Sequence, residues 1–259
     1  MQEYQSADLR NIAVIGHGRT GKTSLLDAAL FNAGGARRFG KVDDGTSALD
    51  YEPEESKRKL SISSALAAVE WRGCKMNFID TPGYPDFVGE MISALNAADS
   101  ALIVVSAPSG METGTEKAWL AVEDLGLPRA IFVNKMDREH ADFERAVDEL
   151  RARFGSGIVP VQLPIGKEDT FQGVADLLTL HMKIVTHEDE ELVADIPEFM
   201  QEAVEEARQQ LIEALSDFDD KLMEKFLEGE EIPEEEIREA LSAGVKAAKV
   251  FPVFCGSAL

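Results

Sequence analysis

The 259-residue sequence lacks several features that would mark particular classes of protein. It has only two cysteines, Cys74 and Cys255, so a disulfide scaffold is not expected and a reducing cytoplasm is the expected compartment. No apolar run approaches the roughly 18 residues of a membrane span, and the polar first ten residues do not fit a secretion signal. The content of 44% hydrophobic and 29% charged residues is ordinary for a globular chain.

Positive charge is scarce, with 26 Lys and Arg against 48 Asp and Glu, a net charge of −22. Residues 186–240 alone carry −17, so the rest of the chain is close to an ordinary balance. A field of this sign does not attract nucleic acid phosphates, so we expect no sequence-specific DNA binding and a preference for basic partners. A solvated helix surface explains the acids of residues 186–240 equally well.

Strand and helix patterns alternate along most of the chain. Short apolar runs predict strands at residues 12–15, 66–71, 76–79, 101–105, 130–133 and 250–254. Helical spacing of apolar residues predicts helices at 23–31, 87–97, 114–125 and 141–154, whereas 32–50 is predicted to be a loop. This alternation predicts an α/β fold in three layers, with a mostly parallel sheet covered on both faces.

Residues 158–248 interrupt this rhythm. Residues 159–171 suggest short strands, and acidic helices are expected at 197–215, 217–227 and 233–247. We therefore predict a main domain made of residues 1–157 and 249–259, and an inserted α+β subdomain at 158–248. Since a helix normally follows the last strand to cover the sheet, the chain is expected to be a fragment of a longer, multidomain protein.

A glycine-rich loop follows the first predicted strand and matches the pattern G-x-x-x-x-G-K-[ST]. It consists of Gly16, His17, Gly18, Arg19, Thr20, Gly21, Lys22 and Thr23, with Ser24 next in the helix. The backbone N–H groups of such a loop and the following helix N-terminus bind phosphates. Lys22 is expected to reach the β- and γ-phosphates, and the Thr23 hydroxyl to bind Mg²⁺. A simple glycine-rich turn is the weaker interpretation, because strand and helix lie on the correct sides.

Two further motifs follow predicted strands. The first is Asp80, Thr81, Pro82 and Gly83, in which Asp80 is expected to hold Mg²⁺ and the Gly83 N–H to contact the γ-phosphate.

The second is Asn134, Lys135, Met136 and Asp137. The Asp137 carboxylate can accept two hydrogen bonds from guanine, and adenine offers no such pair of donors. Asn134 would help at the opposite edge of the base, and the Lys135 stem would lie over its plane. Ser257, Ala258 and Leu259 follow the last strand, and the Ala258 N–H is expected to face the guanine oxygen. The predicted ligands are therefore GTP and GDP, with Mg²⁺; a polar helix N-cap is the alternative.

These motifs resemble those of the translational GTPases, and of bacterial elongation factor G in particular. The resemblance extends to Phe-Val-Gly-Glu at 87–90, Leu-Pro-Ile-Gly at 163–166 and Gly-Ser-Ala at 256–258, and covers nearly the whole chain. It implies GTP binding and hydrolysis, ribosome association, GTP-driven movement of tRNA and mRNA (translocation), and an insertion at the place of the G′ subdomain, which faces the ribosomal stalk protein. That role would give the acidic segment a basic partner. We also expect a monomer.

Three departures from the family pattern point to the elongation factor G-like paralogues. Tyr84 replaces a histidine that positions the attacking water, and a phenol stays neutral near pH 7. Arg19 replaces an aspartate that helps to hold a monovalent cation; it is expected either to act like an arginine finger in cis or to point to solvent or to an acid. Arg-Lys-Leu-Ser at 58–61 replaces Arg-Gly-Ile-Thr: Ser61 keeps a hydroxyl for Mg²⁺, and Lys59 is less free than glycine to adopt positive φ.

The sequence thus predicts the GTP-binding domain of an elongation factor G-like GTPase, with Lys22, Gly83, Tyr84 and Arg19 closest to the chemistry. Two alternatives stay open. One is a ribosome-binding paralogue that is gated by GTP and hydrolyses little, and the other is a non-ribosomal signalling GTPase.

Overall fold

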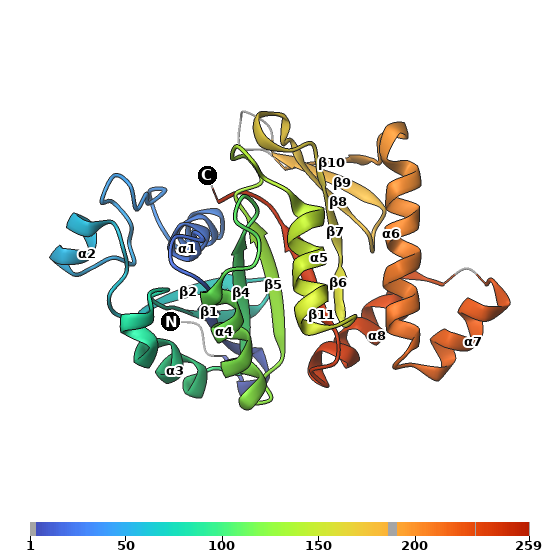
Figure 1. The fold of residues 1–259 in the computed structure, drawn as a ribbon, viewed down its shortest axis with the longest axis horizontal. Helices are drawn as coiled ribbons and strands as arrows, with labels where there is room; N and C mark the ends of the chain where they lie inside the picture. The colour runs from blue at the N-terminus through green and yellow to red at the C-terminus, as the bar shows by residue number, and fades with distance from the viewer. Residues whose placement is uncertain (1–3, 186–190, 231, 259) are drawn as a thin grey trace. The chain divides into compact units, whose positions relative to one another are not determined.

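The structure is a computed structural model, and it describes residues 4–185, 191–230 and 232–258 (Figure 1). The chain forms two units. Unit 1 comprises Met1–Ser106, Met111–Arg129 and Ser257–Leu259, and unit 2 comprises Ala107–Gly110 and Ala130–Gly256. The larger sheet has seven strands in the order β2-β3-β1-β4-β5-β11-β6, and a second sheet has four strands in the order β10-β9-β8-β7. The predicted α/β fold with an inserted subdomain is confirmed.

Unit 1 supplies four strands of the larger sheet. They are β1 (Leu9–Ile15), β2 (Ala65–Trp71), β3 (Cys74–Asp80) and β4 (Ser100–Ser106). β1 pairs in parallel with β3 and β4, whereas β2 and β3 form an antiparallel hairpin. Side chains alternate between the two faces of a strand, and consecutive residues of β1 and β4 are buried, so this part of the sheet is covered on both faces.

Three helices of unit 1, α1 (Lys22–Asn32), α3 (Val88–Ala97) and α4 (Thr113–Asp124), pack on these strands. The short helix α2 (Pro53–Arg58) and the 3₁₀ turns at Ser6–Asp8 and Pro85–Phe87 also belong to this unit. α1 contacts β2 and β3, and its Leu26 and Leu30 join Val14 and Val104 in one apolar cluster. α3 contacts β1, and α4 contacts β4. Residues 33–50 form no helix or strand, and the predicted loop at 32–50 agrees with this to within one residue.

Unit 2 supplies the remaining strands of the larger sheet, β5 (Arg129–Asn134), β6 (Ile158–Pro160) and β11 (Phe251–Cys255). β11 lies parallel to both β5 and β6. α5 (Phe143–Phe154) begins at the N-cap Asp142, whose carboxylate accepts the Arg145 N–H at 2.9 Å, and it packs against β6. Asn134 is the last residue of β5, so the loop that continues through Lys135 and Asp137 follows this strand directly.

The insertion in unit 2 contains an antiparallel sheet and three helices. The strands are β7 (Gln162–Ile165), β8 (Gly173–Asp176), β9 (His181–Val185) and β10 (Glu191–Asp195), with a 3₁₀ turn at Glu168–Thr170 between β7 and β8. The helices are α6 (Glu198–Ser216), α7 (Asp220–Glu228) and α8 (Glu234–Lys246). In Figure 1 α6 is the long helix that leads into α7 and α8, and it contacts both. β8, β9 and β10 were not predicted as separate strands.

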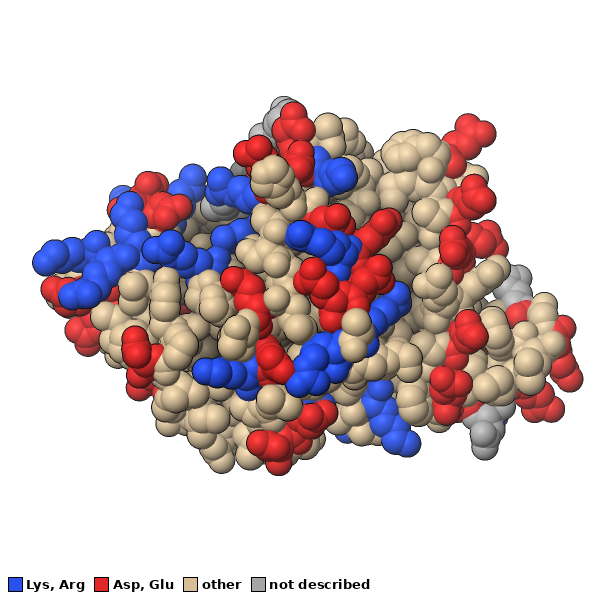
Figure 2. Space-filling model, in the orientation of Figure 1, with Lys and Arg blue, Asp and Glu red and all other residues tan. Residues whose placement is uncertain are grey.

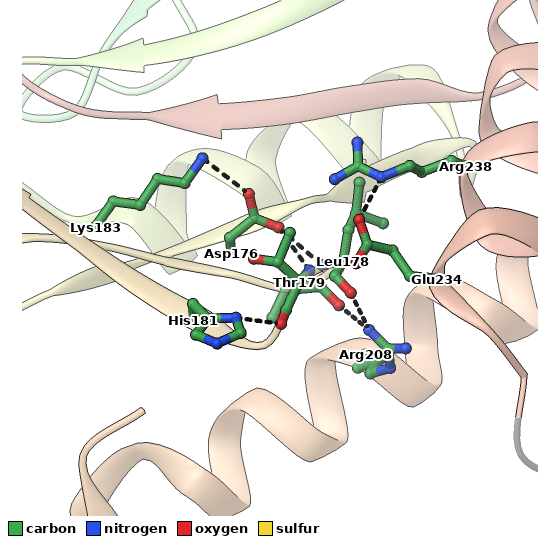
Figure 3. A network of polar contacts seen from close by, with 9 residues as sticks. Asp176, Leu178, Thr179, His181, Lys183, Arg208, Glu234 and Arg238 are labelled. Carbon is green, nitrogen blue, oxygen red and sulfur yellow. Dashed lines mark hydrogen bonds and ion pairs between the residues drawn. The ribbon is translucent and has the colours of Figure 1, made fainter. Parts of the chain in front are cut away.

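Apolar side chains and one arginine hold the insertion together. Leu211, Leu215 and Ile237 are among the buried residues of its core. Arg208 of α6 donates to the carbonyl oxygens of Leu177 and Leu178, and Figure 3 shows the contact with Leu178, so a charged side chain fastens the helix to the turn after β8. The predicted limits of the subdomain, 158–248, stay a prediction. Within the described ranges, no helix is long and apolar enough to cross a membrane.

Candidate functional site

The glycine-rich loop joins β1 to α1, and two of its glycines are required by the backbone. Gly16 has φ 140°, and a Cβ there would overlap the Val104 carbonyl oxygen. Gly21 is the N-cap of α1 and has φ 92°, in the left-handed region that favours glycine. Any other residue at either position would force this loop to change its path, so the sequence pattern has a conformational cause.

Lys22 is the first residue of α1, and only 5% of it is exposed. Its Nζ donates to the carbonyl oxygens of Gly16 at 3.2 Å and His17 at 2.8 Å. Burial lowers the pKa of Lys22 to about 8, although nearby Asp80 and Glu112 act in the opposite direction. The ammonium is still mostly protonated at pH 7, so the loop holds a buried positive charge.

Thr23, Ser61 and Asp80 come together from three separate segments of unit 1. The Thr23 hydroxyl donates to Asp80 Oδ2 at 2.6 Å and lies 3.0 Å from the Ser61 hydroxyl. Asp80 Oδ1 is buried and has no hydrogen-bond partner. Burial raises the pKa of Asp80 to about 7, while Thr23 and Lys22 oppose that shift and Asp50 and Asp27 add to it. The structure thus places all three predicted magnesium ligands side by side.

Two further aspartates lie behind these ligands, and the sequence motifs did not point to them. Asp50 accepts from the Ser61 hydroxyl at 3.0 Å, and Asp27 accepts from the Ala48 N–H at 3.1 Å. Burial raises the pKa of both carboxyls. Asp50 and Asp27 also raise the pKa of Asp80, so the group concentrates negative charge that a cation would neutralise.

Glu55 was also missed, and it fixes the segment that carries Ser61. It is completely buried in α2, and its carboxylate accepts from the N–H groups of Glu52, Ile62 and Ser63 at 2.8–2.9 Å. The available signal was the capping pattern in which an acid stands three residues after the N-cap Glu52, with a proline between them. Glu55 therefore holds both ends of residues 52–63.

Lys59 ends α2 in the left-handed region, with φ 55° and ψ 46°. The sequence interpretation, that lysine at this position is less free than glycine to adopt positive φ, did not anticipate this outcome. The chain adopts the conformation anyway, and the Lys59 ammonium donates to the Asp43 carbonyl oxygen. The contact offsets part of the strain of a non-glycine residue in this region.

Gly83 and Tyr84 lie against the glycine-rich loop. A Cβ on Gly83 would overlap Lys22 Nζ and the backbone of His17 and Gly18, so only glycine permits this approach. The half-buried Tyr84 ring comes so close to Gly18 that a Cβ there would lie 3.1–3.3 Å from it. Tyr84 thus covers the loop with an aromatic face.

The other predicted phosphate-site residues have mixed placements. The Thr81 hydroxyl donates to the Val14 carbonyl oxygen at 2.7 Å, and Thr20 donates to the His17 carbonyl oxygen at 3.1 Å, so both hydroxyls brace backbone. Arg19 is exposed, with φ 65°. Pro82 is buried and Ser24 is half-buried.

His17 is tied to the start of α4. The Gly114 N–H donates to His17 Nδ1 at 3.2 Å, and His17 Nε2 lies 3.4 Å from Glu112 Oε1.

The loop after β5 has its own brace in unit 2. Asn134 and Met136 are buried, and Lys135 has φ 67°. The Met136 N–H donates to the Gly256 carbonyl oxygen at 3.2 Å, and the Gly256 N–H donates to the Val133 carbonyl oxygen at 3.1 Å. The backbone after β5 is thus fastened to the end of β11.

The remaining residues predicted to recognise guanine differ in exposure. Asp137 is half-buried, with its Oδ2 atom 3.5 Å from Arg138 Nε. Of the residues predicted to follow β11, Ser257 is half-buried, Ala258 is buried and Leu259 lies outside the described residues.

The sequence pattern of a known family, described as Elongation factor Tu GTP binding domain, matches residues 7–259. The chain belongs to this family. The elongation factor Tu-type GTP-binding domain implies a GTPase that binds guanine nucleotides, which agrees with the motifs found from the residues alone.

A solved structure supports the same conclusion. The chain is similar to a protein from Thermus thermophilus whose crystal structure is known, with 37% sequence identity and a TM-score of 0.90. The match covers 98% of this chain and 38% of that one, so the chain spans less than half of the relative. The predicted kinship with translational GTPases of the elongation factor G type is confirmed.

The residues of this GTP-binding domain fit a magnesium ion. Within the described part of the chain no group of three or more His, Cys, Asp or Glu side chains is arranged to hold a metal. Mg²⁺ bound to a nucleotide needs few protein ligands, since phosphate oxygens and waters complete its octahedron. The unpartnered Asp80 Oδ1 and the hydroxyls of Thr23 and Ser61 offer the hard oxygen atoms that such an ion prefers.

Proposed function

We propose that this chain is the GTP-binding domain of an elongation factor G-like translational GTPase, in which GTP hydrolysis is coupled to ribosomal translocation or ribosome binding and is slow. The observation that carries the proposal is the buried group in unit 1, where Lys22 lies against the loop carbonyls and Thr23, Ser61 and Asp80 converge. A site with one buried cation and a cluster of hard oxygen ligands suits a magnesium-bound polyphosphate.

The proposed roles follow from these contacts. Lys22 binds the β- and γ-phosphate oxygens in place of the loop carbonyls that it contacts now. Thr23, Ser61 and Asp80 hold Mg²⁺, which neutralises charge on the phosphates when bound. Gly83, at the closest approach to Lys22, offers its N–H to the γ-phosphate. Because buried acceptor bonds fasten residues 52–63, Ser61 is well placed to report whether that phosphate is present.

Guanine selection is assigned to the loop after β5. Asp137 accepts from the N1–H and N2 amine, Asn134 contacts the opposite edge, and Ser257 and Ala258 provide backbone near the guanine oxygen. Adenine would leave the Asp137 carboxylate without donors, which is the physical reason for the expected preference for GTP over ATP.

Slow hydrolysis is proposed because Tyr84 stands where a histidine would position water. Its ring packs on Gly18, and a phenol has no cationic form with which to stabilise the transition state. Loss of one positioning group lowers a rate by roughly 10²–10⁴-fold. The alternative, a ribosome-binding protein that is gated by GTP and hardly turns over, is favoured by the same observation.

The insertion is the proposed contact for a basic partner, the ribosomal stalk protein being the candidate. Acidic side chains follow α6 and surround α7, as Figure 2 shows. We also propose that the chain acts as a monomer in the cytoplasm and that the subdomain spans residues 158–248.

Calorimetry tests the nucleotide site. The protein is titrated with GTP, GDP and ATP in the presence of Mg²⁺. GTP and GDP should bind, and ATP should bind more weakly by about a hundredfold or more, because a site built to hydrogen-bond its ligand discriminates against a ligand that lacks the donors. Equal affinities would overturn the proposal.

Single-turnover hydrolysis with and without ribosomes tests the role of Tyr84, with the full-length wild type, Tyr84→His and Tyr84→Phe compared. We expect Tyr84→His to be faster in the presence of ribosomes and Tyr84→Phe to resemble the wild type. No gain from histidine would remove Tyr84 as the cause of slow turnover.

A further inference from the structure

The loop after β5 adopts a backbone conformation that its own residues do not favour. Lys135 and His140 both have positive φ, 67° and 66°, and neither is glycine. Such residues persist only where surrounding contacts fix them. The hydrogen bond from the Met136 N–H to the Gly256 carbonyl oxygen fixes the backbone next to Lys135. A second contact is needed to fix the backbone at His140.

Glu168 of the insertion supplies that contact at two points. Its backbone N–H donates to the Met136 carbonyl oxygen at 2.8 Å, and its Oε1 atom accepts from the His140 N–H at 2.8 Å. One residue therefore closes the stretch from Met136 to His140, which includes Asp137. Both contacts lie within unit 2.

The turn that carries Glu168 is itself tightly built. It joins β7 to β8, and a Cβ on Gly166, where φ is 76°, would overlap the Thr170 carbonyl oxygen. The Thr170 hydroxyl donates to the Lys167 carbonyl oxygen at 2.6 Å. Glu168 takes φ 54°, a further non-glycine residue in the left-handed region. A turn fixed at this many points is a firm support for a neighbouring loop.

We propose that Glu168 is a positioning residue for guanine recognition, through which the inserted subdomain sets how tightly the loop 134–137 holds the base. The inference rests on the proposed role of Asp137. Without the Glu168 carboxylate, the bond from the His140 N–H is lost and the loop samples other conformations, so the Asp137 carboxylate meets the N1–H and N2 amine less often. A change in the conformation of the β7–β8 turn would therefore change how long the nucleotide stays bound.

The test is the dissociation rate of fluorescently labelled GDP from the full chain, together with the affinity for inosine diphosphate, which lacks the N2 amine. Glu168→Ala is expected to release GDP about 10-fold faster, the effect of losing one hydrogen bond to a charged group. The preference for GDP over inosine diphosphate should fall several-fold, because the missing amine is the group that Asp137 reads. Glu168→Gln keeps an acceptor oxygen and should restore most of both values.

Asp169→Ala is the matched control, since it removes an exposed acid from the same turn and should leave both values at those of the wild type. If Glu168→Ala lowers the melting temperature while the GDP-to-inosine preference stays unchanged, Glu168 is structural only and the inference is wrong. If Glu168→Ala does not fold, Glu168→Asp replaces it: this variant shortens the side chain by one methylene, and the same two measurements are interpreted in the same way. A wild type that binds no GDP would instead refute the proposed function itself, so the two failures are distinguishable.

Discussion

The phosphate-side region of unit 1 and the insertion of unit 2 use charge in opposite ways. In unit 1 the charged groups that matter are buried: Lys22 and Asp80 are at most 5% exposed, and Glu55 is fully buried. In the insertion, acidic side chains lie along exposed helix faces (Figure 2), and the helix pairs Lys225–Glu236 and Glu234–Arg238 have 33–50% of each side chain exposed. The same residue types therefore contribute very different free energies to stability and binding in the two regions.

This difference indicates where a single substitution should have a large effect on stability or binding. A buried charge interacts strongly with its few neighbours, whereas water and salt screen an exposed one. Most described acids between residues 191 and 240 are exposed, so they form a surface that can attract a partner, and single acids there contribute little. The −22 of the whole chain says nothing about the site, whose behaviour depends on a handful of buried groups.

The largest expected effect tests the buried side of this comparison. Lys22→Ala should weaken GTP and GDP binding by about 10²–10³-fold, because it removes two or more charge-assisted hydrogen bonds to phosphate, worth about 3–4 kcal/mol together. Calorimetry measures the change. Lys57→Ala, a lysine with 77% of its side chain exposed, is the control and should bind like the wild type. Equal losses in both variants would mean that net charge, not the buried ammonium, governs binding.

The second prediction concerns pH. The folded pKa of Asp80 is raised from 3.8 to about 7, so the folded state binds the proton more tightly than the unfolded state does. The stability that this carboxyl contributes is full below about pH 4, is lost as the pH rises to about 7, and is constant above that. Asp80→Asn should therefore raise the free energy of unfolding of the nucleotide-free protein at pH 8, by on the order of a few kcal/mol. The gain should shrink steadily between pH 7 and pH 4.

A melting series over this pH range, repeated with GDP and Mg²⁺, checks this prediction. With the ligands present the sign should reverse, because the variant loses a ligand of the metal that the wild type keeps. Asp124→Asn, in which an exposed carboxyl at the end of α4 is neutralised, should follow the wild type throughout. A gain for Asp80→Asn that does not vary with pH would contradict the assigned titration.

The third prediction separates two neighbouring glutamates of α2. Glu55→Ala leaves three backbone N–H groups without their acceptor and should lower the free energy of unfolding by about 2–3 kcal/mol. Glu54→Ala removes only exposed pairs with Lys57 and Arg58 and should change it by less than about 0.5 kcal/mol. Urea unfolding gives the two values, and limited proteolysis within residues 52–63 should be faster for Glu55→Ala alone. Similar losses would show that α2 depends on its charge and not on the buried carboxylate.

The elements of the fold followed from sequence wherever local pattern and tertiary burial agree. The helices α3 to α8 were predicted to within about three residues, because each has an apolar face at helical spacing. The strands β8, β9 and β10 were missed. In β10 the adjacent Leu192 and Val193 are both exposed, so the strand does not alternate between apolar and polar residues, whereas β9, with the sequence His-Met-Lys-Ile-Val, does alternate and was overlooked. Helix α2 was missed because it is short and polar, and only its capping pattern marks it.

The candidate site divides in the same way. Motif residues such as Lys22 and Asp80 could be named from spacing, because phosphate chemistry constrains which residues stand there. Asp27 and Asp50 could not, since their contacts depend on how residues 40–64 return to α1, and no local pattern encodes that path. Glu55 had a local signal in the capping pattern after Glu52, but its bonds to Ile62 and Ser63 depend on the same path. The brace by Glu168 joins positions that are far apart in the sequence and is a property of the folded chain alone.

The smallest expected effect tests the exposed side of the comparison. Glu234 and Arg238 form an i,i+4 pair in α8 with an Nε to Oε1 distance of 2.6 Å, and about half of each side chain is exposed (Figure 3). A double-mutant cycle with Glu234→Ala and Arg238→Ala should give a coupling of only about 0.3–0.5 kcal/mol, which falls further in about 1 M salt. Urea unfolding of the four proteins at low and high salt measures it. Exposed pairs contribute far less than about 2 kcal/mol. A coupling above about 2 kcal/mol that does not change with salt would show that surface charges also stabilise the insertion strongly, and the contrast between the two regions would not hold.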